Sequence, residues 1–131
     1  MKNTFIILYV VIIDQATKYF AVVNVNWKAN TGISFGIFPS FPLWVFFVMI
    51  FVMLFFKMQS KTKLDLGWSL FMAGMIGNLI DRILLSYVVD WIPFPFPFID
   101  RLYINIADIA LIMGFICIFA NNFKRASNDQ Y

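Results

Sequence analysis

The run FPLWVFFVMIFVMLFF, residues 41–56, carries no charge and constrains the fold more than any other stretch. A hydrocarbon core of about 30 Å needs roughly 20 apolar residues in a helical crossing. Three further apolar runs each carry at most two charges, and only 13% of all residues are charged, against about 25% in soluble domains. The sequence therefore predicts an all-α polytopic membrane protein, a single domain over residues 1–131, with four transmembrane helices near 4–23, 41–57, 66–85 and 104–122.

The distribution of lysine and arginine predicts the orientation of these helices. Basic residues cluster beside one set of helix ends, at Lys2, Lys57, Lys61, Lys63, Lys124 and Arg125. The opposite loops, near 24–40 and 86–103, contain only Lys28 and Arg101 as basic residues. Since cytoplasmic loops are enriched in these residues, both termini are expected on the cytoplasmic side. The net charge of +3 then reflects topology, and nucleic acid is not an expected partner.

Missing residue types exclude several kinds of enzyme. The chain has no histidine and no glutamate, and its one cysteine, Cys117, lies in an apolar run. Ser-His and Cys-His nucleophiles, HExxH zinc sites and disulfide frameworks are therefore excluded. If the chain is an enzyme, aspartate is its natural acid and base.

Several polar residues fall inside the predicted helices. Asp14 and Lys18 are four residues apart and share a helical face, as do Asn78 and Asp81, which Arg82 follows. These residues could form ion pairs that permit insertion or fix helix packing, and Lys18 could instead extend to the interface. Alternatively they support a polar site, because ionisable groups inside membranes usually face the bundle interior.

Small residues in the third predicted helix indicate where another helix can pack. Gly74 and Gly77 allow close approach by a neighbouring helix, either of the same chain or of a second copy. The sequence leaves these two arrangements open.

The outer loops contain two distinctive segments. In NTG, residues 30–32, Asn30 and Gly32 indicate either a plain turn or a lining for a substrate cleft. In WIPFPFPF, residues 91–98, prolines at every second position exclude regular helix. The aromatic residues favour a location at the headgroup boundary, where this segment should lie on the membrane like an apolar lid. The alternative is a plain linker, which would more often be polar and solvated.

Two aspartates are expected to meet at the outer surface. Asn105 and Asp108 share a face at the start of the fourth helix, and Asp90 lies at the beginning of a loop that returns to that surface. Asn105 could instead be only a helix cap, with Asp108 stabilising the first turn. Asp100 is a weaker candidate, and Asp65 and Asp129 are expected on the cytoplasmic side.

A close pair of carboxylates permits peptide hydrolysis without metal, thiol or imidazole. Two carboxylates that nearly touch cannot both ionise easily, so the pair shares a proton near neutral pH. The ionised member can take a proton from water while the other donates to the scissile carbonyl. The pattern therefore predicts an aspartyl protease dyad.

The chain resembles the lipoprotein signal peptidases, or signal peptidase II family, over nearly its whole length. The resemblance consists of five short blocks in order: DQATK at 14–18, NTG at 30–32, GNLIDR at 77–82, VVD at 88–90 and NIAD at 105–108. It implies an aspartic endopeptidase that cuts diacylglyceryl-modified prolipoproteins before the lipidated cysteine. It also implies a bacterial inner-membrane location, an outer-face site with a small extramembrane β-cradle, and inhibition by globomycin. No metal or cofactor is implied, and a monomer is expected.

The resemblance also assigns roles to individual residues. The catalytic pair falls on Asp90 and Asp108. The supporting or substrate-binding residues fall on Asp14, Lys18, Asn30, Gly32, Asn78, Asp81, Arg82 and Asn105. Two departures from the family pattern concern the substrate cleft. The segment between Lys18 and Asn30 is short, which predicts a shortened cradle, and Ile33-Ser34 follows NTG where the family usually has two alanines.

Two other functions compete with the peptidase. Paired intramembrane Asp and Lys also occur in small proton- or ion-coupled transporters, although no inverted repeat is evident. A catalytically inactive membrane adaptor would keep the helices without needing both outer aspartates.

Overall fold

The computed structural model describes residues 2–32, 51, 65–96 and 99–128. The predicted helix at 41–57 thus lies outside the described residues, apart from Phe51, and so do Ile33, Ser34 and Pro97. The long helices of the described part are α1 (Lys2–Asn24), α3 (Leu66–Leu85) and α4 (Ile106–Asn128).

These helices match three of the predicted transmembrane segments. α3 has the predicted bounds, whereas α4 begins after Asn105 because that residue caps it. Asp65 caps α3 in the same way, accepting a 3.0 Å hydrogen bond from the N–H of Trp68. By length and composition, α1 and α3 are each able to cross a membrane, and α4 contains a shorter apolar segment.

The helices pack through a seam of small residues. α3 contacts both α1 and α4. A side chain at Gly74 would collide with Ala107 and Leu111 of α4, and one at Gly77 would meet Asp14 of α1 at 2.6 Å. Of the two arrangements that the sequence leaves open, the structure shows the first: these glycines pack inside one chain.

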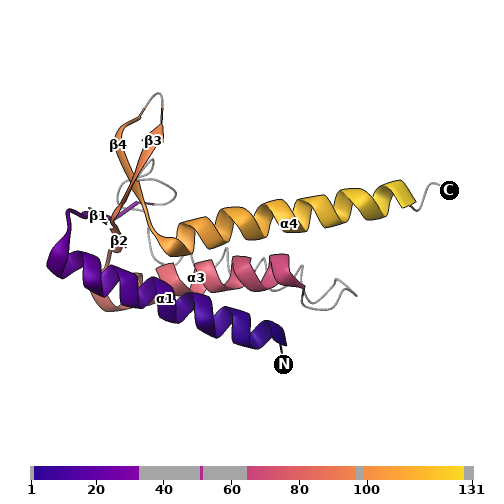
Figure 1. Cartoon of the computed structure of the whole chain (residues 1–131), viewed down its shortest axis with the longest axis horizontal. Helices are drawn as coiled ribbons and strands as arrows, with labels where there is room; N and C mark the ends of the chain where they lie inside the picture. The colour runs from indigo at the N-terminus through magenta and orange to yellow at the C-terminus, as the bar shows by residue number, and fades with distance from the viewer. Residues whose placement is uncertain (1, 33–50, 52–64, 97–98, 129–131) are drawn as a thin grey trace.

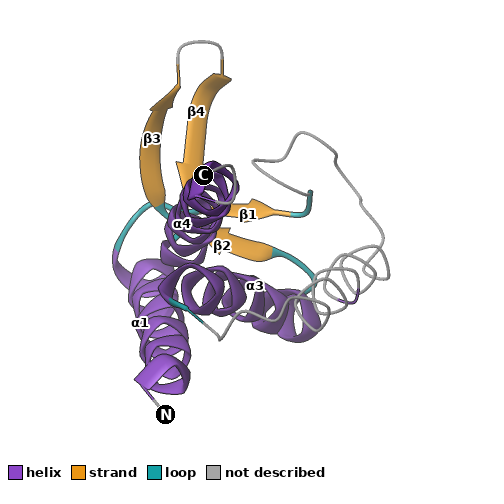
Figure 2. Ribbon diagram, turned by 90° about the vertical axis from the view of Figure 1, so that its right-hand side faces the viewer, coloured by secondary structure: helices purple, strands orange, loops and turns teal. Residues whose placement is uncertain are grey.

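Short strands lie at one end of the helices. β1 (Lys28–Asn30) pairs antiparallel with β2 (Val88–Asp90), with Lys28 opposite Asp90. β3 (Ile92–Phe96) and β4 (Ile99–Ile104) form an antiparallel hairpin that projects across the direction of the helices (Figures 1 and 2). The expected absence of helix around Pro93 and Pro95 is confirmed. The small sheets agree with the expected β-cradle. β1 has only three residues, in line with the short segment between Lys18 and Asn30.

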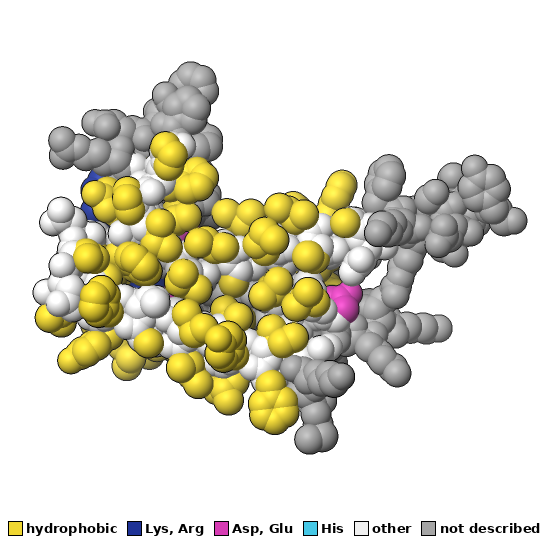
Figure 3. Space-filling view, in the orientation of Figure 1, with side chains coloured by type: hydrophobic (Ala, Val, Ile, Leu, Met, Phe, Trp, Pro, Cys, Tyr) yellow, Lys and Arg dark blue, Asp and Glu magenta, His cyan; other side chains and the backbone are white. Residues whose placement is uncertain are grey.

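The helical surface is apolar, as a membrane protein requires. Figure 3 shows hydrophobic side chains over the visible flank of the helices. Phe5, Tyr19 and Phe115 are each more than half exposed, which would be unfavourable in water. α1 begins and α4 ends away from the strands, at the other end of the molecule (Figure 1).

Candidate active site

The structure brings Asp90 and Asp108 together through Asn105. Asp90 is the last residue of β2, and Asp108 lies in the first turn of α4. The side-chain amide of Asn105 donates to Asp90 Oδ1 at 2.6 Å, and its backbone N–H donates to Asp108 Oδ2 at 3.2 Å. The backbone N–H of Asp108 in turn donates to Asn105 Oδ1 at 2.9 Å. Asn105 is therefore both the helix cap and a direct partner of Asp90.

Two more asparagines complete the hydrogen bonding of the pair. Asn30 Nδ2 donates to Asp90 Oδ2, and Asn78 Nδ2 donates to Asp108 Oδ1, each at 2.8 Å. All four carboxylate oxygens thus accept a hydrogen bond from an asparagine of β1, α3 or the start of α4. Such bonds hold both carboxyl groups in fixed positions.

The side-chain amides of these asparagines are themselves held in one orientation. Lys18 Nζ donates to Asn78 Oδ1, and the backbone N–H of Gly32 donates to Asn30 Oδ1, both at 3.0 Å. Asn105 Oδ1 is likewise occupied, as described above. Because each amide oxygen already accepts a hydrogen bond, each NH₂ group is directed at a carboxylate.

Burial and charge change the acidity of Asp90. Burial, followed by the negative charge of Asp108, raises the pKa of Asp90 from 3.8 to about 7. Hydrogen bonds from Asn30 and Asn105, and the charge of Lys18, act in the opposite direction but do not cancel the rise. This carboxyl group therefore holds a proton up to neutral pH.

A buried cluster of charged residues lies next to Asp90 and Asp108. Lys18 Nζ lies 2.8 Å from Asp14 Oδ2 and 3.0 Å from Asp81 Oδ2. All three residues are at most 3% exposed. Lys18 is therefore buried, and the possibility that its side chain extends to the membrane interface is wrong. The predicted pairing of Asp14 with Lys18 is confirmed, and Asp81 joins it.

Arg82 connects α3 to the NTG segment. Its Nη2 donates to the backbone oxygen of Gly32 at 3.0 Å, and its Nη1 donates to that of Asn78 at 3.2 Å. The guanidinium group thus links Asn78 to Gly32, whose own backbone N–H donates to Asn30 Oδ1. The NTG segment therefore contacts Asp90 through Asn30 and Arg82 through Gly32.

One participant, Gln15, has no predicted role. Its Nε2 donates to Asp81 Oδ1 at 2.9 Å and to the backbone oxygen of Gly77 at 3.1 Å. The available signal was helical spacing, because positions 14, 15 and 18 lie on one side of a helix. That signal shows a shared polar face but does not identify its partners on α3.

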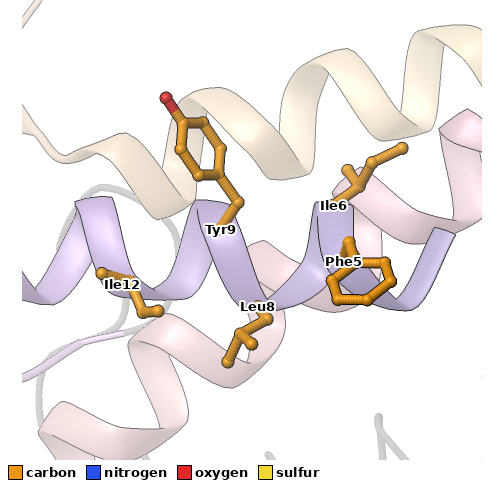
Figure 4. Close-up of a pocket in the computed structure, with 5 residues that line it drawn as sticks. All are labelled: Phe5, Ile6, Leu8, Tyr9 and Ile12. Atoms are coloured by element: carbon orange, nitrogen blue, oxygen red, sulfur yellow. The ribbon is translucent and has the colours of Figure 1, made fainter. Parts of the chain in front are cut away.

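Other candidate positions lie outside this arrangement. Asp65 caps the far end of α3 and accepts a 3.3 Å hydrogen bond from Asn121. The side chain of Asp100 and the whole of Asp129 lie outside the described residues. An apolar recess on α1, shown in Figure 4, contains no carboxylate and is separate from the site; it is lined by Phe5, Ile6, Leu8, Tyr9 and Ile12.

Comparison with solved structures agrees with this architecture. Two structures of bacterial membrane enzymes, both solved by the in meso method, superpose with TM-scores of 0.82 and 0.76. Each is 29% identical in sequence. The first comparison covers 97% of this chain and 90% of the solved chain, and the second covers 94% and 93%.

Sequence comparison gives the family. The family model described as signal peptidase (SPase) II matches residues 6–124. A lipoprotein signal peptidase of Thermodesulfovibrio yellowstonii is 29% identical, with 95% of this chain and 96% of the relative covered. One of Staphylococcus aureus is 33% identical over 95% and 90% of the two chains, and one of Buchnera aphidicola is 34% identical over 85% and 78%. The chain therefore belongs to the signal peptidase II family.

Proposed function

We propose that this protein is an aspartic endopeptidase that removes the signal peptide from diacylglyceryl-modified prolipoproteins, cutting before the lipidated cysteine. Asp90 and Asp108 are its catalytic dyad. The observation that carries the proposal is the shared asparagine: Asn105 bonds both carboxyl groups, which lie on different elements. Membership of the signal peptidase II family supports the substrate class.

The raised pKa of Asp90 suits this chemistry. With one proton shared by the dyad, the ionised carboxylate takes a proton from the attacking water. The protonated partner donates to the scissile carbonyl oxygen as the tetrahedral intermediate forms. The two groups then exchange roles, and a proton passes to the departing amine. The asparagines keep both carboxyl groups in place throughout.

The expected topology fits a lipidated substrate. We infer four transmembrane helices in the bacterial cytoplasmic membrane, with cytoplasmic termini and the dyad at the outer face. There the acyl chains of a substrate stay in lipid while its scissile bond lies near the surface, where water is available. A monomer holds every described site residue, and globomycin-type inhibitors are expected to compete for the site.

Conversion of a lipidated prolipoprotein to its shorter form on a gel tests the proposal. Asp90→Asn and Asp108→Asn should each abolish conversion by the purified protein. Asp65→Asn is the matched control, because asparagine also caps helices well and Asp65 lies at the far end of α3. Full activity in either dyad variant would overturn the assignment. Proton flux into liposomes without proteolysis would favour the transporter instead.

A further inference from the structure

The two buried carboxylates beneath the dyad have matching contacts. Asp14 Oδ1 accepts the backbone N–H of Ala107 at 2.8 Å, and Asp81 Oδ2 accepts that of Val89 at 3.0 Å. Ala107 and Val89 each immediately precede a dyad aspartate in the sequence. Each supporting carboxylate therefore holds the backbone beside one member of the dyad.

Two side chains of α1 connect these supporting carboxylates. Lys18 contacts both, but its third contact is to Asn78 Oδ1, so the three N–H donors of its ammonium group are all occupied. Asp81 Oδ1 is instead held by Gln15 Nε2 at 2.9 Å. The same amide nitrogen also lies 3.1 Å from the backbone oxygen of Gly77 and 3.2 Å from Asp14 Oδ2. Gln15 is thus the second connection between Asp14 and Asp81, and it is uncharged.

We propose that Gln15 is a positioning residue that, together with Lys18, fixes Asp14 against Asp81 and thereby sets the separation of the dyad carboxyl groups. The inference rests on the proposed function only in taking Asp90 and Asp108 as the dyad. Without the amide of Gln15, a buried oxygen of Asp81 has lost its donor. Asp81 then rotates or admits water, and β2 moves with it through Val89.

Spacing of the dyad has a measurable consequence. Like charges further apart repel less, so a wider dyad gives up its shared proton at lower pH. Among the side chains that the structure describes, the charged groups near the dyad, besides its own two members, are Asp14 and Lys18 of α1, Lys28 opposite Asp90 on β1, and Asp81 and Arg82 of α3. Replacing Gln15 changes none of these charges. A shift in the pH dependence of activity would therefore reflect a changed separation of the two dyad carboxyl groups.

Gln15→Met tests the inference, because methionine keeps the length of the side chain and removes the amide. Thr17→Val is the matched control, since the Thr17 hydroxyl donates only to backbone oxygens of its own helix in the described structure. With a lipidated prolipoprotein in lipid-containing micelles, we expect kcat to fall about 10-fold in Gln15→Met while KM changes less than about 2-fold. In the plot of kcat against pH, the transition that reports the shared proton of the dyad should move to lower pH by about half a unit or more. The control should match the wild type in both respects.

Two results would overturn the inference. One is wild-type kcat and pH dependence in Gln15→Met. The other is a lower kcat with an unchanged pH profile and lower thermal stability, which would show a purely structural role. If Gln15→Met does not accumulate, Gln15→Ser takes its place, because the smaller side chain leaves room for water.

An infrared titration separates this inference from the proposed function. The carboxylic acid band that disappears in Asp90→Asn reports protonation of the dyad without substrate. Its midpoint should lie at lower pH in Gln15→Met than in the wild type, and an unchanged midpoint contradicts the inference whether or not the wild type is active. Failure of the wild type to cut any lipidated prolipoprotein would instead count against the proposed function.

Discussion

Asn105 donates a 2.6 Å hydrogen bond to Asp90 while its own side-chain oxygen caps the helix that begins after it. One residue thus joins the end of β2 to the start of α4. The local role stabilises the helix, and the long-range role positions a carboxyl group. Separate substitutions can distinguish the two.

Two substitutions of Asn105 should affect stability and activity differently. Asn105→Ala removes both the cap and the bond to Asp90, so we expect a loss of about 1 kcal/mol in the free energy of unfolding and a fall in kcat of about 10- to 100-fold. Asn105→Ser keeps a capping oxygen but has no amide, so stability should recover while kcat stays low. Thermal unfolding and the gel conversion assay measure the two effects. Recovery of kcat in Asn105→Ser would show that the bond to Asp90 has no catalytic role.

The raised pKa of Asp90 predicts how stability depends on pH. The folded state binds this proton more tightly than the unfolded chain, in which the pKa is near 3.8. The contribution of Asp90 to the free energy of unfolding is therefore greatest below about pH 4, falls as the pH rises to about 7, and is constant above that. The fall amounts to at most about 4 kcal/mol. Thermal unfolding from pH 4 to 8 should show it in the wild type and not in Asp90→Asn. An equal slope in both proteins would contradict the prediction.

Contacts within one helix could be predicted from the sequence. The spacing of Asp14 and Lys18 indicates an ion pair, which is present. The spacing of Asn105 and Asp108 fits a shared face or a helix cap, and the structure shows the cap. Helical periodicity alone fixes such neighbours, because residues three or four apart always lie close together.

Contacts between elements could not be predicted in the same way. Asn30 reaches Asp90 across 60 residues, and Lys18 reaches Asn78 across the same separation. Which faces meet depends on how closely the helices approach, and that depends on packing at residues such as Gly77. The resemblance named most of these residues as a set, whereas the structure supplies their partners.

Arg82 should not be replaceable by lysine. Its guanidinium group donates to the backbone oxygens of Gly32 and Asn78 from two different nitrogens. A single ammonium group on a shorter side chain does not reproduce both bonds. We expect Arg82→Lys to lower kcat/KM about 10-fold with little change in thermal stability. Equal kcat/KM in Arg82→Lys and the wild type would show that the positive charge alone is sufficient.

Gly77→Ala should disturb the site through packing. A Cβ atom at this position would lie 2.6 Å from Asp14 Oδ2, so the carboxylate must shift away from its partners. We expect a loss of about 1–3 kcal/mol in the free energy of unfolding. The specific activity of the folded fraction should also fall, because Asp14 holds the backbone beside Asp108.

Gly67→Ala separates overpacking from displacement of Asp14. A Cβ atom at Gly67 would lie 2.9 Å from Cys117 Cβ of α4, so this position also packs α3 against α4. Gly67 is the second residue of α3, at the end that Asp65 caps and away from the dyad. This variant should lose comparable stability and keep the specific activity of its folded fraction. Circular dichroism melting and the conversion assay, both normalised to monodisperse protein, give the two quantities. If the two variants lose specific activity equally, the effect belongs to the helix seam as a whole and Asp14 has no special part in it.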